Sequence, residues 1–392
     1  MADKAFLTPK ILKWARESSK ISLEDAAKKV NVSPERLEAW ENGADYPTIR
    51  QASMLAKFYR RPFSLFFLPD IPLDFQPLQD FRSDDSIDLD TASLFIIREI
   101  QQKQSWISDL YEETGEEALP FIGKFSLDNN PEEVAIDILK ALNINPEYYE
   151  KDPIKEWIEK AERAGIFVSR TSFIHSKLII DKDVIQGFAI ADKYAPFVFV
   201  NSQNWDAPQL FTLVHELAHI WIAKSGISNE IEIDIVGDRK SKYHPVELFC
   251  NVVAANALMP VNLMMSIPSD VFDSQRSVFR IVKTLGVSSF AFLYRSLNLG
   301  LIDLNSYREL KKDAEEAFNE FVLREQEKKR KRKEEEKVGG PSPYLLKLNK
   351  NSRLFTRVVM DSYKSGILPP SIASNLLNTK INKFSKFETY MT

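Results

Sequence analysis

The amino-acid sequence predicts a mainly α-helical protein with a small β-sheet, which is the α+β fold class. Apolar residues recur at the 3.6-residue spacing of amphipathic helices through most of the chain. Short β-branched and aromatic runs, typical of strands, are confined to residues 165–201. Because 392 residues exceed what one ordinary core accommodates, two or three domains are expected.

The bulk composition limits the classes of function. A net charge of −4 argues against a molecule that coats nucleic acid with its whole surface, although not against one small basic module. The single cysteine, Cys250, excludes an intrachain disulfide framework and fits a reducing compartment. The N-terminus has no basic patch followed by an apolar run, and no stretch reaches about 18 uninterrupted apolar residues. We therefore expect a cytoplasmic protein that does not bind a membrane.

Residues 7–68 predict an all-α domain of four short helices. Ser22 is a candidate N-cap with Asp25 at the capping-box spacing, and Asn42-Gly43 ends the third helix. The four helices are expected at Lys10–Arg16, Ser22–Val30, Ser33–Glu41 and Ala52–Tyr59.

The remainder divides by changes in composition. Residues 69–91 combine prolines with an acidic cluster and predict a linker, and residues 92–305 predict a second domain. Residues 306–340 predict a charged helix and a linker, because acidic and basic side chains alternate there. Residues 341–392 form a C-terminal tail region without a recognisable motif. Within the second domain, strands are expected at 165–169, 177–180, 184–191 and 196–201, and helices at 208–224, 245–258, 271–285, 289–297 and, beyond it, 306–323.

The motif His215-Glu216-Leu217-Ala218-His219 predicts a divalent-metal site. Histidines four residues apart share one face of a helix, so both imidazoles can reach one ion. The flanking residues are strongly apolar, and a buried glutamate is costly unless it has a partner. Glu216 is placed to take a proton from a water molecule that zinc makes acidic, which is the arrangement in zinc peptidases. Although the string also arises by chance, two of only four histidines fall in it.

A zinc site of this type needs a third protein ligand. Glu247 is the next candidate, at the start of the apolar helix expected at 245–258. A glutamate in a first helical turn is usually only a partner of the helix dipole, so spacing alone leaves its ligation open.

Two separated blocks resemble the signatures of ImmA/IrrE-type metallopeptidases. They are Phe211–His219 and Glu247–Pro260, and Val287–Ile302 is also similar to a segment of that family. The resemblance implies a zincin-like domain holding Zn²⁺ through His215, His219 and Glu247, with Glu216 as the general base.

Several neighbours of this motif are further candidates. Asn251 lies one helical turn beyond Glu247 and is expected to orient that carboxylate from the second coordination shell. His244 and Tyr243 precede the ligand helix and could stabilise a transition state, or His244 could simply cap the helix. Cys250 stands where the family usually has alanine and is interpreted as a core residue.

The N-terminal domain resembles the XRE (Cro- and lambda-repressor-like) helix-turn-helix family. The resemblance rests on Ile21–Ala27, Val30–Ser33, Leu37–Gly43 and Pro47-Thr48, with Leu37 and Trp40 expected in the core. The candidates for DNA backbone contacts are Lys28, Lys29, Arg50, Arg60 and Arg61, and those for base edges are Arg36 and Asn42.

Two acidic residues leave the use of this domain open. Glu35 and Glu38 lie on the solvent face of the expected recognition helix and are unfavourable near phosphates, so a protein-binding use of the fold stays open. Such modules usually bind operator DNA in pairs, which predicts a homodimer.

Two functional hypotheses follow. The first is a DNA-binding transcriptional regulator whose zinc metallopeptidase domain hydrolyses a peptide bond in a regulatory protein or in itself. The alternative is an antitoxin-like repressor of a toxin–antitoxin operon, which binds and neutralises a cognate toxin while peptidase activity is secondary or absent. The intact Glu216 favours an enzyme, because a binding scaffold does not need a general base.

Overall fold

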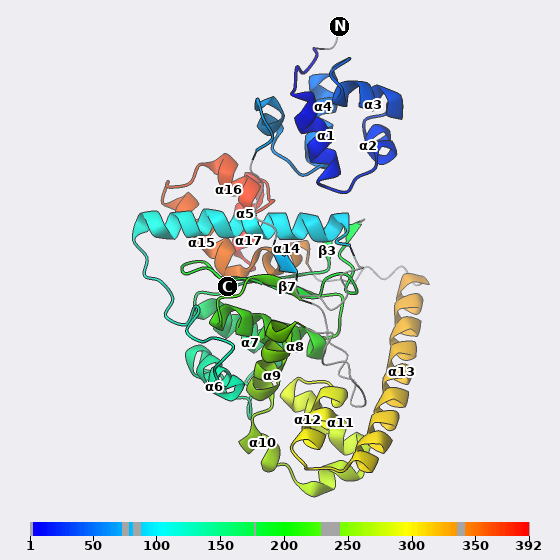
Figure 1. Ribbon diagram of the computed structural model, residues 1–392, viewed down its shortest axis with the longest axis vertical. Coiled ribbons are helices and arrows are strands. Elements are labelled where there is room, and N and C mark those ends of the chain that lie inside the picture. The colour runs from blue at the N-terminus through cyan, green and yellow to red at the C-terminus, as the bar shows by residue number, and fades with distance from the viewer. Residues whose placement is uncertain are drawn as a thin grey trace. The chain divides into compact units, whose positions relative to one another are not determined.

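The computed structural model describes residues 3–72, 78–80, 88–175, 178–228, 244–334 and 342–391 (Figure 1). It is mainly helical with a five-stranded and a two-stranded sheet, which confirms the α+β class. The chain forms two compact units. Unit 1 comprises Met1–Pro77, Ser86–Gln101 and Phe173–Ile180, and unit 2 comprises Leu78–Asp85, Gln102–Ser172 and Asp181–Thr392.

Unit 1 contains the short helices expected near the N-terminus. The Ser22 hydroxyl accepts a hydrogen bond from the Asp25 backbone N–H, as the capping-box spacing indicated. The fourth helix starts earlier than expected because Thr48 and Gln51 form a capping box. Its elements are α1 (Pro9–Glu17), α2 (Leu23–Lys29), α3 (Pro34–Glu41), α4 (Ile49–Phe58), the 3₁₀ helix η1 (Phe63–Phe67), the first part of α5 (Thr91–Thr114), β3 (Phe173–His175) and β4 (Leu178–Ile179).

A buried ion pair fastens α1 to α3. The guanidinium of Arg16 donates to both carboxylate oxygens of Glu41, at 2.8 Å each. Leu37 and Trp40 on α3 are fully buried, which confirms that they face the core. Gly43 then adopts a φ of +79° and ends the helix, a conformation that favours glycine.

The main sheet of unit 2 has the strand order β1-β7-β5-β6-β2. β2 and β6 are parallel, β5 is antiparallel to both β6 and β7, and β1 is parallel to β7. Every residue of β5 and β6 is buried, which explains their continuous apolar sequence. The strands are β1 (Gln79–Asp80), β2 (Phe167–Thr171), β5 (Gly187–Ile190), β6 (Phe197–Asn201) and β7 (Gly226–Ser228).

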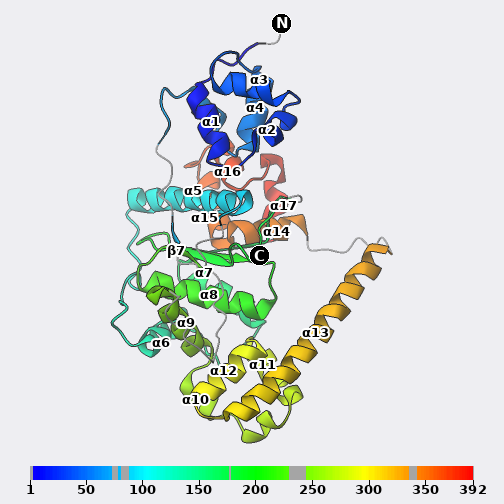
Figure 2. The same cartoon turned by 45° about the vertical axis from the view of Figure 1, so that its right-hand side comes forward.

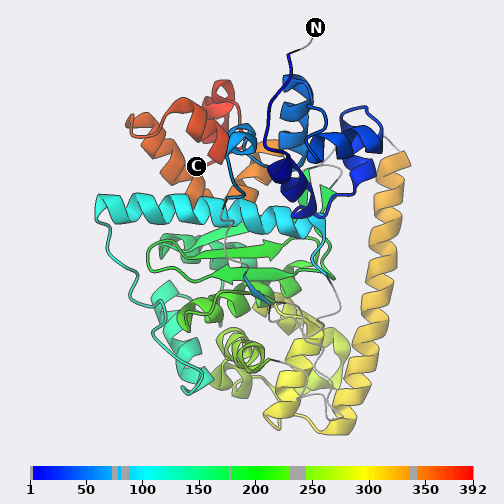
Figure 3. The ribbon, with the colours of Figure 1, turned by 45° about the horizontal axis from the view of Figure 1, so that its top comes forward.

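Two helical layers cover this sheet. Helix α8 packs against β5 and β6, whereas α14 and α15 pack against β2. Figures 2 and 3 show the strands between these layers. The helices of unit 2 are α6 (Pro131–Leu142), α7 (Pro153–Arg163), α8 (Asp206–Trp221), α9 (Pro245–Leu258), α10 (Val261–Met265), η3 (Ser269–Asp273), α11 (Gln275–Leu285), α12 (Ser289–Asn298), α13 (Leu304–Glu334), α14 (Pro343–Asn351), α15 (Arg353–Lys364), α16 (Pro370–Leu376), η4 (Ile381–Lys383) and α17 (Phe384–Glu388), together with the rest of α5.

Helix α13 is longer than the sequence predicted. Helix α13 continues to Glu334, eleven residues beyond the expected end at residue 323. Exposed pairs such as Arg324–Glu320 and Lys328–Glu325 support this extension.

In the part of the chain that the structure describes, no single helix is long and apolar enough to cross a membrane. Helices α11 and α12 pass that test only together, with a bend of 100° between them.

The residues expected as a motif-free tail form an integral part of unit 2. The Glu162 carboxylate on α7 accepts hydrogen bonds from the Ser352 hydroxyl at 2.5 Å and from the Arg353 backbone N–H at 2.9 Å, at the start of α15. The Ser169 hydroxyl on β2 donates to the Lys350 carbonyl at 2.6 Å. Burial raises the pKa of Glu162. These buried polar contacts attach α14 and α15 to the core.

Candidate metal centre

Helix α8 brings His215 and His219 together. They lie one turn apart, and their Nε2 atoms are 3.1 Å from each other. Their exposed fractions are only 4% and 0%, because α8 is packed between the sheet and α9. The expected pairing of the two imidazoles on one helix face is therefore present in the geometry.

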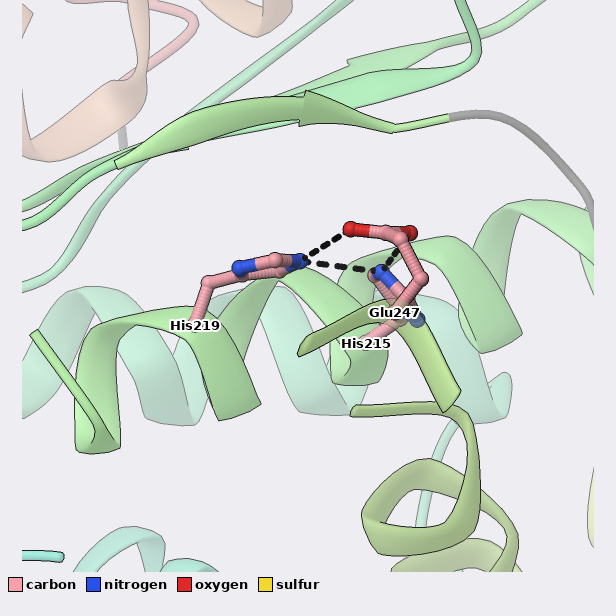
Figure 4. A group of neighbouring side chains, drawn as sticks. All are labelled: His215, His219 and Glu247. Atoms are coloured by element: carbon pink, nitrogen blue, oxygen red, sulfur yellow. Dashed lines mark hydrogen bonds and ion pairs between the residues drawn. The ribbon is translucent and has the colours of Figure 1, made fainter. Parts of the chain in front are cut away.

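Glu247 reaches the same point from the first turn of α9. Its carboxylate oxygens lie 3.0 Å from His215 Nε2 and 3.1 Å from His219 Nε2 (Figure 4). Within the described residues these three side chains form a buried group able to hold one metal ion. The contact between α8 and α9, which is among the most extensive in the molecule, fixes this approach.

The donor set fits a divalent cation. Both carboxylate oxygens of Glu247 are buried, and neither accepts a hydrogen bond, although each lies close to an imidazole nitrogen. A tetrahedral ion about 2.0–2.1 Å from its ligands would set neighbouring ligand atoms about 3.3 Å apart, close to the distances found here. Two imidazoles and one carboxylate suit Zn²⁺ and leave a fourth position for a water molecule or a substrate.

Protonation of the three side chains is coupled. Burial disfavours the charged imidazolium, but the carboxylates of Glu247 and Glu216 outweigh it and raise the pKa of His215 to about 9. Burial also opposes the Glu247 carboxylate, yet the charge of His215 and contacts with both imidazoles lower its pKa to about 2. Burial lowers the pKa of His219. Two imidazole nitrogens and a carboxylate thus face one point that favours a positive charge, which a metal ion would supply.

Asn251 contacts a different metal-site residue from the one that the sequence suggested. Its Oδ1 atom is 2.9 Å from Nδ1 of His215, so it orients the imidazole and not the Glu247 carboxylate. Asn251 is one helical turn from Glu247 on α9, but its side-chain amide extends toward the neighbouring helix α8, where His215 lies. By accepting the Nδ1 proton, Asn251 would keep Nε2 of His215 free to bind an ion.

Glu216 lies between the two histidines on α8 and is fully buried. A Cβ atom built on Gly187 of β5 would be 2.7 Å from its Oε1 atom, so the carboxylate lies against the backbone of that strand. Gly187 was not among the candidate residues predicted from the sequence. The available signal was a lone glycine at the start of an apolar strand, which often marks a close approach of another group.

Two of the other residues near the motif, His244 and Cys250, have structural roles. His244 is exposed and is the N-cap of α9, where its Nδ1 atom accepts a hydrogen bond from the Val246 N–H at 3.3 Å. Of its two possible roles, the structure therefore supports capping. Tyr243 lies outside the described residues. Cys250 is buried, burial raises the pKa of its thiol, and it is not a member of the metal-binding group.

The far ends of both site helices are held in place. Trp221 at the end of α8 stacks on Phe121, with ring centroids 4.4 Å apart, and the Gly123 N–H donates to the Ile220 carbonyl. At the end of α9, the Arg295 guanidinium donates to the carbonyl of Met259 at 3.3 Å. Arg295 thus caps the C-terminal end of α9.

In unit 1, five of the residues proposed for DNA contacts lie on the surface: Lys28, Lys29, Arg36, Asn42 and Arg50. The other two candidates make contacts within unit 1, since Arg60 pairs with Glu99 at 3.3 Å and Arg61 lies over the Trp14 ring at 4.4 Å. Arg36 also lies 3.8 Å from the Asp45 carboxylate, and its guanidinium carbon is 5.9 Å from the centre of the Trp40 ring. A hydrogen bond from Lys4 lowers the pKa of Asp45 to about 2. Glu35 and Glu38 are exposed as well, so the solvent face of α3 carries both acidic and basic side chains.

Comparison with known proteins agrees with both halves of this description. The model of the helix-turn-helix family matches residues 12–66, and that of the IrrE N-terminal-like domain matches residues 161–297, which include α8 and α9. The chain is also 29% identical over 98 residues to the radiation response metalloprotease IrrE of Deinococcus deserti. That match covers 25% of this chain and 34% of the relative, so the chain spans about a third of the relative's length. The chain therefore combines an XRE-type helix-turn-helix domain at its N-terminus with an IrrE-like peptidase domain.

Proposed function

We propose that this protein is a transcriptional regulator whose IrrE-like domain is a zinc-dependent endopeptidase, hydrolysing a peptide bond in a regulatory protein or in the chain itself. The observation that carries the proposal is the convergence of His215, His219 and Glu247 within 3.1 Å of one another, with Glu216 between the histidines. Three metal ligands and an adjacent carboxylate base are the set that zinc-assisted peptide hydrolysis requires.

Each residue has a separate task in this proposal. His215, His219 and Glu247 would hold Zn²⁺, which when bound polarises a peptide carbonyl and lowers the pKa of a water molecule. Glu216 would accept the proton of the attacking water and deliver it to the leaving amine. Its complete burial keeps this carboxylate out of bulk solvent, where its electrostatic effect would be weaker. Asn251 would hold His215 in the ligating tautomer.

The helix-turn-helix domain would supply operator binding. Lys28, Lys29 and Arg50 would contact phosphates, while Arg36 and Asn42 on or beside α3 would reach base edges. A homodimer in the cytoplasm would match the twofold symmetry usual for such operators. In this arrangement, cleavage within or near the bound regulator would release it from DNA.

The test is a comparison of protein N-termini in cells that express either the wild-type chain or Glu216→Gln. We expect at least one new N-terminus that requires Glu216, in another regulatory protein or in this chain. A complete absence of such a product, with repression unchanged by Glu216→Gln, would remove the peptidase proposal. Neutralisation of a toxin by both forms would then identify the antitoxin-like alternative.

A further inference from the structure

At Gly187, strand β5 lies directly against helix α8. Its backbone is paired on both sides, with Val200 of β6 and with Ser228 of β7. A Cβ atom at this position would lie 2.6 Å from Cγ2 of Thr212, 2.7 Å from Oε1 of Glu216 and 3.1 Å from the carbonyl oxygen of Phe199. No side chain fits there unless a neighbour moves.

The two side chains that meet Gly187 belong to one face of α8. Thr212 and Glu216 are four residues apart, so they lie one above the other on the helix surface. The Thr212 hydroxyl donates to the Pro208 carbonyl at 3.0 Å, which leaves its methyl group toward the strand. The contact with Gly187 therefore involves one apolar group and one carboxylate.

We infer that Gly187 is a positioning residue for Glu216. Because it has no side chain, the backbone of β5 can lie against the carboxylate and hold it beside His215 and His219. β5 has little freedom to retreat, since it is hydrogen-bonded to a strand on each side. The inference rests on the proposed role of Glu216 as the general base.

The chemistry of the three contacts indicates what an added methyl group would displace. The Phe199 carbonyl is backbone within a paired strand and resists movement. Thr212 is a short β-branched side chain that is fixed close to the helix backbone, whereas the Glu216 carboxylate is the far end of a longer side chain with more rotatable bonds. Alanine at position 187 would therefore push the carboxylate aside, while the metal ligands, none of which supplies one of the three atoms nearest to the added methyl group, stay in place.

A role in packing alone makes a different prediction. Glycine in a strand interior weakens the strand, so it is retained where space demands it. If space beside Thr212 were the whole reason, shortening Thr212 to serine would restore everything that Gly187→Ala removes. If Glu216 is the relevant neighbour, the double variant Gly187→Ala/Thr212→Ser regains stability but not the position of the carboxylate.

The experiment compares Gly187→Ala/Thr212→Ser with Thr212→Ser alone, in the full-length protein. We expect similar zinc content in the two variants and a urea midpoint that is slightly lower in the double variant, because its Glu216 carboxylate is displaced. The double variant should lose the Glu216-dependent cleavage product to the extent that Glu216→Gln does, and its crystal structure should show the carboxylate displaced from its wild-type position. Restored cleavage, or an unmoved carboxylate, would overturn the inference.

A second measurement decides the matter without any activity. Glu216→Ala is added to both variants, and the four urea midpoints form a cycle. Because Thr212→Ser and Glu216→Ala together remove the two side-chain groups nearest to the added methyl group, the shift of the midpoint caused by Gly187→Ala should become smaller, leaving only the effect of the Phe199 carbonyl oxygen at 3.1 Å. An equal shift with and without Glu216→Ala would show that Gly187 does not act through Glu216. If the wild-type chain cleaves nothing, the proposed function fails, while this cycle still tests the contact.

Discussion

Two buried glutamates, Glu41 in unit 1 and Glu247 in unit 2, meet their partners in different ways. Both oxygens of Glu41 accept hydrogen bonds from the Arg16 guanidinium, so its charge is fully compensated by the protein. Both oxygens of Glu247 instead converge with two imidazole nitrogens, and neither accepts a hydrogen bond. A satisfied carboxylate is a structural device, whereas an unsatisfied one beside two imidazoles is a place for a cation.

The catalytic part of this difference gives the largest expected effect. Glu216→Gln keeps the size of the side chain but removes the base, so cleavage should fall by about 10²- to 10⁴-fold. Zinc content should stay at the wild-type level, because Glu216 is not a member of the ligand group. Quantifying the cleavage product by mass spectrometry checks the first point, and elemental analysis checks the second. Unchanged cleavage would show that another group takes the proton.

The structural half of the comparison predicts a loss of stability without any dependence on metal. Glu41→Ala removes the carboxylate that pairs with Arg16 and leaves that largely buried guanidinium without it, which should lower the free energy of unfolding by about 3–5 kcal/mol. Urea unfolding followed by the fluorescence of the helix-turn-helix domain measures this loss. Added zinc or a chelator should leave it unchanged, and a dependence on zinc would contradict the distinction drawn here.

Stability that depends on metal should appear in unit 2. Zinc at 1,000 times its dissociation constant should stabilise the wild-type chain by about 4 kcal/mol relative to the chelated form, because only the folded state presents the site. Glu247→Ala should abolish most of that difference, since it removes one of three ligands. Thermal unfolding with and without chelator measures it. An equal response of wild type and Glu247→Ala would exclude Glu247 as a ligand.

Asn251 offers a smaller test of the same site. Replacing it with alanine removes the acceptor at Nδ1 of His215, and zinc should then bind about 10- to 100-fold more weakly. Competition with a chromogenic chelator gives the affinity. Asn256→Ala on the same helix is a matched control, because its amide contacts Val252 and Arg295 instead. Equal affinities for wild type and Asn251→Ala would limit Asn251 to packing.

The weakest expected effects concern DNA. Asn42→Ala should cost about 1–3 kcal/mol on an operator selected from random sequences and relax specificity at one base pair. Lys28→Ala should weaken binding to all sequences and reduce the dependence of binding on salt. Fluorescence anisotropy at several salt concentrations separates the two. If neither variant alters binding, unit 1 uses another surface.

The sequence predicted local structure well where prolines mark the ends of a helix or where a fixed spacing places two side chains on one helix face. Helix α9 has the expected bounds, because Pro245 starts it and Pro260 follows its end. The histidine pair on α8 was accessible for the same reason, since one turn of helix fixes the relation of His215 to His219. Strands β1 and β7 were missed because they are only two and three residues long and acquire their structure from pairing partners.

The errors arose where contacts join distant parts of the chain. Asn251 was assigned to the carboxylate on its own helix, but the packing of α8 on α9 presents it to His215. The attachment of the C-terminal helices could not be predicted from a local motif, because the buried contact for α15 comes from Glu162, which is far away in sequence. Gly187 carries no functional group, so its role depends entirely on what lies opposite it in space.

The most direct test of the metal centre is a crystal structure of the zinc-loaded protein with anomalous data on both sides of the zinc absorption edge. The account predicts one strong peak per chain, bounded by His215 Nε2, His219 Nε2 and the Glu247 carboxylate, which disappears in Glu247→Ala. A peak elsewhere, or none in protein that retains all three side chains, would contradict the central claim.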